Sequence, residues 1–562
     1  MSLPAGRQGF SDPSSRAVGS LRGAVGYRLL KIASVVKRIS SLPSKQLFQV
    51  RVLADAQWYN GYMKEASIPK EVLQIAEILK SDGYSAYLVG GCVRDVVIGR
   101  EPNDWDVATD AVPETVLALF PDSVYENDFG TVGVKTESEE ATLKIIEVTT
   151  FRTEESYSDK RRPDKVHFAK TIEEDLSRRD FTVNAMALPL VGKNKDLVDP
   201  YGGQEDLKNR IIRAVGDADE RFNEDVLRLM RAVRFSAMLG FEIEEGTKEA
   251  VKKNAHLLSH IAKERVHDEL VKLLMSERAG DGIEVMRETG LLAEVIPELL
   301  EGVDCEQNMH HIYSVYEHNL KSLEYAVEKK YSLVVRLASL LHDVGKPNSR
   351  RWKATPVGGK TKGDEKGDYT FYGHQVVGER MVRKILERLK FSSDVIEQVA
   401  LLVREHMFVY DPEAVTLAGV RRLLARIGVD QVDNLMKVRE ADRIGSGVPK
   451  AQPYRLRHLQ AMFEKVKTDP VSAKMLKVNG GILIKELGME PSPRMGQIIS
   501  ALLEEVLDEP GKNTLEYLLG RAKELGELTD EELKNLKKQA QARAQAEQDR
   551  IDEEIKKKYF VS

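Results

Sequence analysis

Hydrophobic patterning changes character partway along the chain, and this change limits the folds that the sequence can adopt. Between residues 84 and 190, short strand-like runs such as AYLVGG, TVGVKT and LKIIEVTTF alternate with helical or loop segments. From about residue 219 onward, apolar residues recur at the three- and four-residue spacing of amphipathic helices. We therefore expect an α+β multidomain protein, with a small mixed β-sheet followed by mostly helical domains.

Length and composition narrow the class of protein further. The 562 residues exceed what one hydrophobic core supports. A net charge of −5 argues against a wholly basic nucleic-acid coat protein, although a local basic groove remains compatible with it. No apolar run reaches about 18 residues, so we expect no membrane span. Two cysteines, Cys92 and Cys305, make neither a disulfide framework nor a zinc cluster, which favours a reducing, cytoplasmic location.

Three segments read as poorly structured. Residues 1–62 begin with a Ser-, Gly- and Arg-rich stretch that is typical of an organellar transit peptide, but a disordered leader or a misplaced start codon is the simpler interpretation. The Gly- and Lys-rich stretch from Lys353 to Tyr369 predicts a long surface loop. Residues 529–562 form a charged extension without an apolar face, and we assign it no function.

A glycine turn opens the mixed region. The segment LVGGCVRD runs from a strand through Gly90 and Gly91 into a helix. Glycines at such a place let backbone N–H groups approach a phosphate, and the guanidinium of Arg94 suits phosphate oxygens. A Gly-Gly pair alone is also common structural punctuation.

Two carboxylates follow this turn at short range. Asp104 and Asp106 stand at i and i+2 in NDWDV, so a strand would project both from one face. Neighbouring acids repel each other unless a cation lies between them, and oxygen-rich sites of this kind hold Mg²⁺ against substrate phosphates. We expect these acids to be catalytic, with Glu147 of the strand IIEV as a third acid or as a solvent-facing residue.

These motifs together carry a family resemblance. G-G-x-V-R-D, then G-R, then D-W-D-V-A-T resembles the nucleotidyltransferase head of the bacterial-type (class II) tRNA CCA-adding enzymes and their poly(A) polymerase relatives. The resemblance runs from about residue 63 to about residue 525. It implies template-independent transfer of nucleotides to the 3′ end of tRNA, with Mg²⁺ as cofactor and CTP and ATP as substrates.

The resemblance also extends to later parts of the head. The charged segment FRTEESYSDKRRP is similar to the family's flexible loop and includes Arg152. The segment SRRDFTVNA matches the family's second motif. Its residues would bind the nucleotide, although the adjacent charges could equally form a structural ion pair; they are Arg178, Arg179, Asp180 and Asn184.

The segment EDVLR suggests how a base could be chosen without a template. Asp225 and Arg228 stand at i and i+3, which would place them on one helix face. A carboxylate accepts and a guanidinium donates hydrogen bonds, so the pair can match the edge of cytosine or adenine and reject uracil and guanine. In the family, these positions of E-D-x-x-R form the amino-acid template. Arg231 and Arg234 continue a basic stripe, which either contacts nucleotide or primer RNA or is simply solvated.

A second constellation lies in the helical region, where histidines and acids recur on successive predicted helices. Such groups can converge on a metal in a bundle core. Their order, H…HD…H…H…D, resembles an HD-domain phosphohydrolase, with 2′,3′-cyclic phosphates, 2′-phosphates or cyclic dinucleotides as candidate substrates. An HD fold that serves only as an RNA-binding body is the alternative. The expected ligands of a second divalent metal are His318, His342, Asp343, His374, His406 and Asp442.

The sequence thus predicts a modular enzyme that partners tRNA and has no membrane anchor. The expected parts are a head (63–210), a neck for base selection and RNA binding (211–300), an HD domain (301–460) and a tRNA-binding tail (461–528). Rival interpretations are a poly(A) polymerase, an enzyme that adds only CC or only A, an HD phosphohydrolase with an RNA-sensing head, and a non-catalytic RNA-binding protein.

Overall fold

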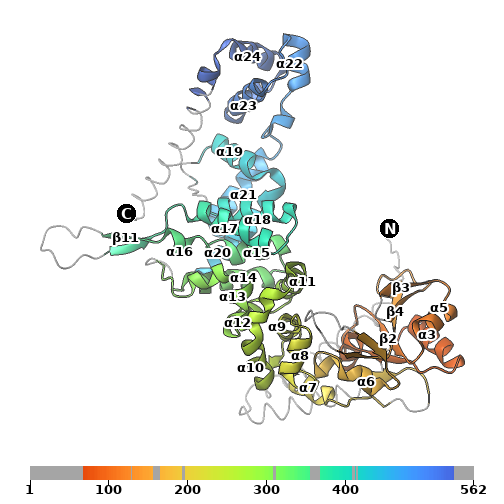
Figure 1. Ribbon diagram of the computed structural model, residues 1–562. Coiled ribbons are helices and arrows are strands. Elements are labelled where there is room, and N and C mark those ends of the chain that lie inside the picture. Colours follow the sequence, from red (N-terminus) through yellow and green to blue (C-terminus); the bar gives the residue numbers. More distant parts are fainter. Residues whose placement is uncertain are drawn as a thin grey trace, which may run out of the picture. The chain divides into compact units, whose positions relative to one another are not determined.

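The computed structural model describes most of the chain between residues 68 and 539 (Figure 1). The described residues are 68–127, 130–155, 165–192, 196–307, 312–354, 367–407, 412, 415–533, 535–536 and 539. The predicted leader, most of the charged segment after Arg152, and the end of the charged extension lie outside them. The chain divides into a head unit (Met1–Thr153 and Val166–Leu207) and a helical unit (Glu154–Lys165 and Lys208–Ser562).

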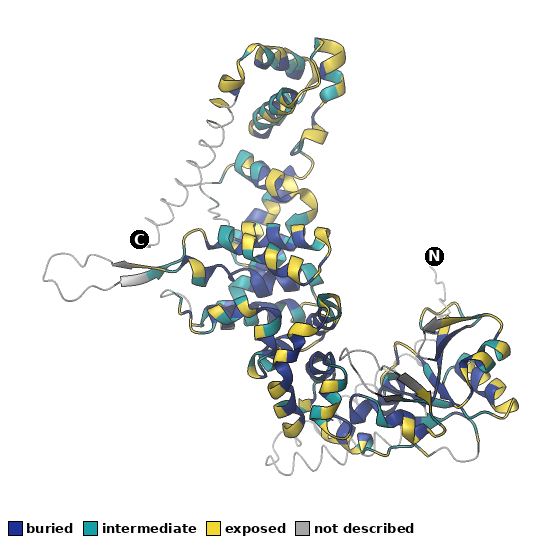
Figure 2. Cartoon of the chain, in the orientation of Figure 1, coloured by how far each residue is buried: buried dark blue, intermediate teal, exposed yellow. Residues whose placement is uncertain are grey.

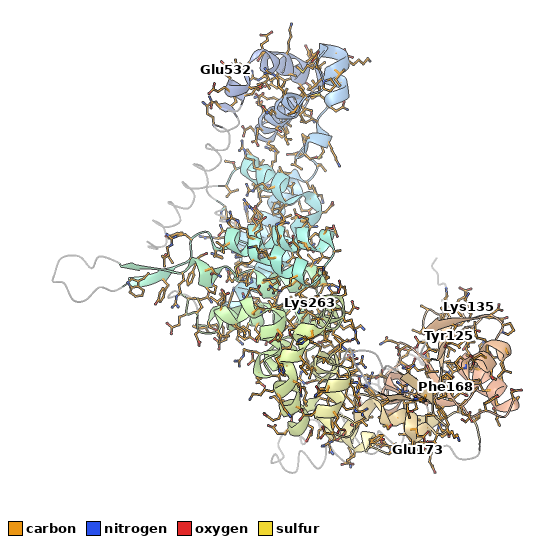
Figure 3. The ribbon with its side chains drawn as sticks, viewed as in Figure 1. Tyr125, Lys135, Phe168, Glu173, Lys263 and Glu532 are labelled. Atoms are coloured by element: carbon orange, nitrogen blue, oxygen red, sulfur yellow. The ribbon has the colours of Figure 1, made fainter. Side chains whose placement is uncertain are left out.

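The head unit is built on a six-stranded sheet of order β3-β4-β5-β2-β1-β8. Its strands are β1 (Tyr87–Val89), β2 (Asp106–Thr109), β3 (Ser123–Asn127), β4 (Thr131–Lys135), β5 (Ile145–Thr150) and β8 (Ala187–Pro189). The neighbours β2 and β5 are parallel, whereas the other pairs in the sheet are antiparallel. The predicted mixed sheet is confirmed. On the edge strand β3, Tyr125 is exposed (Figure 3).

Short helices surround this sheet. They are α3 (Lys70–Ser81), α4 (Gly91–Val97), α5 (Pro113–Leu119), α6 (Ile172–Ser177) and α7 (Gly203–Asn209). Helix α6 begins with a capping box between Thr171 and Glu174, which satisfies N–H groups that a helix start leaves open. Its Ile172 and Leu176 pack in one core cluster with Phe151 and with residues of β1, β2 and β8. This packing sets the end of α6, and the arginines that follow it, against the sheet.

The helical unit accounts for the rest of the described chain. Its α-helices of five or more residues are α8 (Ala218–Glu224), α9 (Arg228–Leu239), α10 (Glu245–Asn254), α11 (Lys263–Leu274), α12 (Ala279–Glu288), α13 (Leu291–Val295), α14 (Val315–Glu328), α15 (Leu333–Leu341), α17 (His374–Arg388), α18 (Ser393–Glu405), α19 (Leu417–Ile427), α20 (Val432–Gly445), α21 (Tyr454–Val466), α22 (Gly480–Leu487), α23 (Pro493–Asp508) and α24 (Leu515–Glu527). Buried residues line the inner faces of α14, α15, α18 and α20, which pack on one another (Figure 2). The predicted α+β multidomain class is confirmed. Among the described helices, none has the length and apolar character that crossing a bilayer requires.

Strands also occur outside the head, where the sequence predicts helices and loops. β9 (Ile211–Ile212) pairs with β10 (Glu242–Ile243) in parallel. β11 (Arg351–Ala354) pairs with β12 (Gly367–Thr370), so the stretch predicted as one long surface loop is framed by an antiparallel ribbon. Facing side chains Trp352 and Tyr369 account for this pairing, because cross-strand aromatic pairs stabilise a ribbon. Residues 355–366 between the strands lie outside the described residues.

Close packing of α14 against α20 depends on Gly445. A Cβ atom at this position would overlap Ser322 Oγ and lie 2.8 Å from the carbonyl oxygen of His318. We expect Gly445→Ala to lower the free energy of unfolding of the helical unit by about 1–3 kcal/mol, because a packed interface must open to admit the methyl group. Thermal unfolding measures this change. Gly496→Ala in α23 is the matched control, since a Cβ atom added there would meet nothing within 4 Å; equal stability of the two variants would contradict the packing argument.

Candidate functional site

Three acids of the head meet at the start of β2. Asp106 is the first residue of β2, and its Cα is the register partner of Glu147 on the parallel strand β5. Asp104 lies in a bend just before the strand, not in the strand itself. Trp105 between the two aspartates is 7% exposed, whereas Asp104 is exposed, so the chain alternates there as an extended segment does. The predicted acids therefore lie close together.

Electrostatics within this cluster favour a cation. Burial, together with the nearby carboxylates of Asp104 and Glu147, raises the pKa of Asp106 to about 7, against the guanidinium of Arg179, which lowers it. Three carboxylates crowded at a partly buried place are ionised together only at a cost, which a divalent cation offsets. Carboxylate oxygens are also the ligands that hard divalent cations prefer. The donor set fits a metal site.

The glycine turn lies directly against these acids. Gly90 has φ = 76°, a left-handed conformation that side chains rarely adopt. A Cβ atom there would lie 2.9 Å from Nη1 of Arg179 and 3.4 Å from Oδ2 of Asp106. Glycine is thus required both by the backbone angle and by the close approach of an arginine and an acid. The structure brings the turn, Arg179 and Asp106 to one place.

Arg94 is buried next to the turn and is held there by hydrogen bonds. Its Nε and Nη2 each donate to the carboxylate of Asp95 at 2.9 Å, and its Nη1 donates to Asn184 Oδ1 at 2.8 Å. Asn184 in turn donates to Asp180 Oδ1 at 3.1 Å. These predicted nucleotide-binding residues therefore form one buried hydrogen-bonded network, and their direct contact with a nucleotide stays a prediction.

Asp175 organises the arginines at the end of α6. Arg178 Nη2 lies 2.8 Å from Asp175 Oδ1, and Arg179 Nη2 lies 3.1 Å from Oδ2. The backbone N–H of Arg152 also donates to Asp175 Oδ1, at 3.3 Å. Burial alone would raise the pKa of Asp175, but the two guanidinium groups outweigh it and hold the pKa below its usual range. A fixed carboxylate thus aims Arg179 at the acid cluster.

The base-selection pair does not share a helix face, and that part of the prediction is wrong. Helix α8 ends at Glu224, Asp225 is extended (φ −133°, ψ 103°), and α9 begins at Arg228. The carboxylate of Asp225 accepts the N–H of Leu227 at 3.1 Å, a local bond that competes with helix continuation. Both roles in base selection stay predictions.

Each member of this pair has its own partner. Arg265 of α11 donates from Nη1 and Nη2 to the two carboxylate oxygens of Asp225, at 3.3 and 3.1 Å. Arg228 Nη1 donates to Glu224 Oε2 at 2.7 Å and to the carbonyl of Arg221 at 3.2 Å. The two side chains are therefore held separately in defined orientations.

The predicted basic stripe on α9 divides into a buried and a half-buried residue. Arg234 is 6% exposed, donates to Glu269 Oε2 at 2.5 Å and lies over the ring of Phe235 at 4.0 Å. Arg231 Nη1 lies 4.0 Å from Glu269 Oε1, and its side chain is 33% exposed. Arg231 retains access to a ligand, whereas Arg234 is held inside the unit by its acid.

All six predicted HD ligands converge in the bundle. They come from α14, α20, the start of α17 and the ends of α15 and α18. His318, His342 and Asp442 form one potential metal-holding group, and Asp343, His374 and His406 form a second. Asp343 joins the groups, because its Oδ2 lies 3.2 Å from His318 Nε2 and its Oδ1 lies 3.2 Å from His374 Nε2.

Hydrogen bonds of the imidazoles show what the cluster can hold. Nδ1 of three histidines faces a backbone carbonyl: Ser339 for His342, Phe371 for His374 and Val403 for His406, at 2.6–2.8 Å. Each Nδ1 is therefore the donor, so Nε2 points inward and presents a lone pair whenever the ring is neutral. His374 Nε2 and His406 Nε2 are only 3.4 Å apart. Lone pairs and carboxylate oxygens that converge in this way fit divalent cations.

Protonation of the cluster competes with metal binding. Burial alone would lower the pKa of His342, but Asp343 and Asp442 outweigh it and raise the pKa to about 10. Burial, with the neighbouring His342 and His374 acting in the same direction, lowers the pKa of His406 to about 4, against Asp343, which raises it. A metal must therefore displace a proton from His342, while His406 is a ready ligand.

Several partner residues escaped the sequence analysis. They are Asp175, Arg265, Glu269 and Lys346, whose Nζ lies 2.6 Å from Asp343 Oδ2. Spacing could have revealed two of them: Asp175 precedes its arginines by three and four residues, and Lys346 follows Asp343 by three. Arg265 and Glu269 come from another helix, so no local pattern signals them.

Family signatures match three parts of the chain. The Poly A polymerase head domain matches residues 86–213, the probable RNA and SrmB-binding site of polymerase A matches residues 240–302, and the HD domain matches residues 315–445. The first match contains the glycine turn and the acid cluster. The third contains all six residues of the convergent histidine and acid cluster.

Curated relatives carry the name CCA-adding enzyme. The relative from Ligilactobacillus salivarius is 33% identical over 466 residues, which cover 81% of this chain and 96% of the relative. The relative from Geobacillus kaustophilus is 48% identical over 225 residues, which are 40% of this chain and 54% of the relative. Against this and other Geobacillus relatives, the chain therefore spans about half their length.

Solved structures agree with these matches. The Bacillus stearothermophilus CCA-adding enzyme in complex with CTP has a TM-score of 0.56 and 30% identity, over 81% of this chain and 96% of that one. A CCA-adding enzyme in complex with ATP has a TM-score of 0.53 at 18% identity, over 83% of this chain and 98% of that one. At 18% identity, the second match shows a similar fold and nothing more.

Metal content tests the convergent cluster directly. We expect the chain to retain up to two divalent ions after dialysis, and we expect replacement of His342 and Asp343 by Ala together to remove both, because Asp343 joins the two groups. Apparent affinity for added Mn²⁺ should weaken as the pH falls from about 8.5 to about 6.5, since protons compete for the ligands. Elemental analysis and titration measure this. The exposed His256→Ala is the control; unchanged metal content in the double variant would refute the site.

Proposed function

This chain belongs to the family of CCA-adding enzymes, and we propose that it transfers CMP and AMP from CTP and ATP to the 3′ end of tRNA without a nucleic-acid template. The observation that carries the proposal is the meeting of Asp106, Glu147 and the Gly90 turn on the neighbouring central strands β2 and β5 and at the end of β1. Similarity to curated CCA-adding enzymes over 80–81% of this chain and 94–97% of each relative supports it.

The acid cluster supplies the reaction with a place for divalent metal. We assign the metal ligands to Asp104 and Asp106, propose Mg²⁺ as the ion, and place Glu147 as a third acid beside them. When bound, such ions neutralise charge on the triphosphate. In the transfer, the tRNA 3′-hydroxyl gives up its proton to solvent and its oxygen bonds to the α-phosphorus, while the bond from that phosphorus to the oxygen bridging the β-phosphate breaks and pyrophosphate leaves.

Arginines near the cluster would receive the triphosphate. Arg179 lies against Gly90 and Asp106, and Asp175 holds it there. Its guanidinium is suited to the phosphate charge that the metals leave uncompensated. The buried hydrogen-bonded network of Arg94, Asp180 and Asn184 would stabilise the conformation of the glycine turn. Positioning of this kind, rather than covalent chemistry, is what phosphoryl-type transfers need from a protein.

Base choice would rest on Asp225 and Arg228. The carboxylate can accept from the amino group that cytosine and adenine share, and the guanidinium can donate to the ring nitrogen beside it. Uracil and guanine present a carbonyl oxygen where the amino group should be, and the carboxylate repels it. The paired donors of Arg265 support this role, because they hold the Asp225 carboxylate in one orientation without help from the nucleotide.

The six convergent residues of the HD domain (His318, His342, Asp343, His374, His406 and Asp442), here called the HD cluster, favour a second candidate function, hydrolysis of a phosphoester. Its completeness is the specific observation: both three-residue groups are present, five of the six residues are buried, and three of the histidines are held by backbone carbonyls. In such a hydrolysis a water oxygen bonds to phosphorus, one ester P–O bond breaks, and the departing oxygen takes a proton. Lys346 beside Asp343 adds a positive charge at the site. An RNA-binding body without metal would need no such convergence.

Extension of a tRNA that lacks its last three nucleotides tests the principal function. We expect two C residues with CTP alone and completion with one A when ATP is added; a long A ladder would instead indicate a poly(A) polymerase. Asp106→Asn should reduce incorporation by roughly 10²–10³-fold, because metal stabilisation of charge is worth several kcal/mol. Asp122→Asn, an exposed acid of the same unit, is the control. Full activity of Asp106→Asn would overturn the assignment.

Substitution at Asp225 tests base selection separately from chemistry. We expect Asp225→Ala to lower discrimination of CTP and ATP against UTP and GTP by roughly tenfold or more, with a smaller loss in Mg²⁺-dependent incorporation, because the repelling carboxylate is gone. Single-nucleotide extension rates measure both effects. Asp268→Ala, an exposed acid on α11, serves as the matched control. An unchanged preference for CTP and ATP in Asp225→Ala would refute the role.

A further inference from the structure

The β11–β12 ribbon rises directly from the HD cluster. Its first leg leaves Asp343 through the short helix α16 (Lys346–Ser349), and its second leg returns through Tyr372 to His374. The two legs touch at the base, where a Cβ on Gly345 would overlap the carbonyl oxygen of His374 and lie 2.5 Å from the nitrogen of Gly378. Figure 1 shows β11 projecting from the helices beside α16.

Aromatic and cationic side chains are concentrated on this ribbon. The ring centroids of Trp352 and Tyr369 are 5.0 Å apart at 74°, and the guanidinium of Arg350 lies 3.6 Å over the Tyr369 ring. Trp352 is nevertheless 56% exposed. Tyr372, which follows β12 two positions before His374, is 66% exposed, and Arg351 is exposed as well.

Ribbon stability explains only part of this arrangement. A cross-strand pair accounts for Trp352 against Tyr369, since such pairs stabilise two-stranded ribbons. It does not account for the exposed ring of Tyr372, which lies beyond the strand, nor for the cations on the same segment. Exposed rings interleaved with cations are the combination that single-stranded nucleic acids recognise, because bases stack on rings while phosphates meet positive charge.

We propose that this ribbon is a stacking platform for the unpaired end of a single-stranded RNA, whose terminal base rests on Trp352 and Tyr372 while its terminal phosphate enters the HD cluster. The proposal rests on the hydrolytic function proposed above for that cluster. Two cations on the segment between cluster and ribbon give this path a positive charge: Lys346 Nζ lies 2.6 Å from Asp343 Oδ2, and the guanidinium of Arg350 lies over the Tyr369 ring. RNA phosphates complement this charge, whereas a purely apolar partner would not.

Comparison of two substrates, one with and one without the terminal base, tests the stacking. The probe is a short oligoribonucleotide with a 2′,3′-cyclic phosphate end, made with its terminal base or with an abasic terminal ribose. On the metal-loaded full chain, we expect the base to lower KM by roughly tenfold, as one stacked base does elsewhere. In Trp352→Ala and in Tyr372→Ala, the KM of the base-bearing probe should rise to nearly that of the abasic probe. The KM of the abasic probe and the kcat of both probes should stay nearly unchanged.

Control variants separate this effect from loss of folding. Tyr454→Ala removes a ring of α21 that is 64% exposed, close to the exposure of Tyr372, and should leave the base effect intact. Trp352→Phe keeps a ring and should keep part of the effect. A full base effect in both Trp352→Ala and Tyr372→Ala would overturn the platform.

A second measurement does not depend on hydrolysis. Quenching of tryptophan emission by the base-bearing oligonucleotide should occur in the wild-type chain with its metals removed by chelation and be largely lost in Trp352→Phe. Absence of hydrolysis on either probe, with quenching retained, would reject the hydrolytic function and support the stacking. Hydrolysis without any Trp352-dependent quenching would reject the stacking and leave the hydrolytic function standing.

Discussion

Ionisable groups held close together dominate both candidate sites. In the head, Asp106 sits partly buried beside two further carboxylates, and both burial and the repulsion between the acids raise its pKa. In the helical unit, imidazole Nε2 atoms and the carboxylates of Asp343 and Asp442 point toward one another. Neither arrangement is favourable without positive charge at its centre. The folds hold these groups together at a cost that bound cations would offset.

Fixed ion pairs around these centres set the orientation of the remaining polar groups. Asp175 holds Arg179 toward the head acids, Arg265 holds Asp225, and Glu269 retains Arg234 inside the unit. Each of these partners is at least partly shielded from water, so the geometry is better defined than that of an exposed surface pair. Preorganisation of this kind suits the proposed transfer of nucleotides without a template, because no second nucleic-acid strand would help to position them.

Local spacing predicted the chemistry of the sites better than their geometry. The closeness of Asp104 and Asp106 followed from their separation by one residue, and the order of the HD residues anticipated their convergence. The same kind of reasoning failed at Asp225, where a side-chain bond to the backbone interrupts the expected helix. It also treated Arg234 as a surface residue, because burial depends on a partner contributed by another helix. Domain boundaries and individual catalytic roles stay predictions.

By itself, the sequence determined the class of the protein: an α+β head with a glycine turn and paired acids, followed by helices that carry six metal-ligand candidates. Those features depend on residue type and on separations of a few positions, which secondary structure converts directly into neighbouring side chains. Only the tertiary structure decided that Glu147 joins Asp106 across two parallel strands, that Asp343 joins two groups of ligands, and that an aromatic ribbon rises from the HD cluster. These contacts join residues far apart in the chain, and long-range packing, not local spacing, sets their distances.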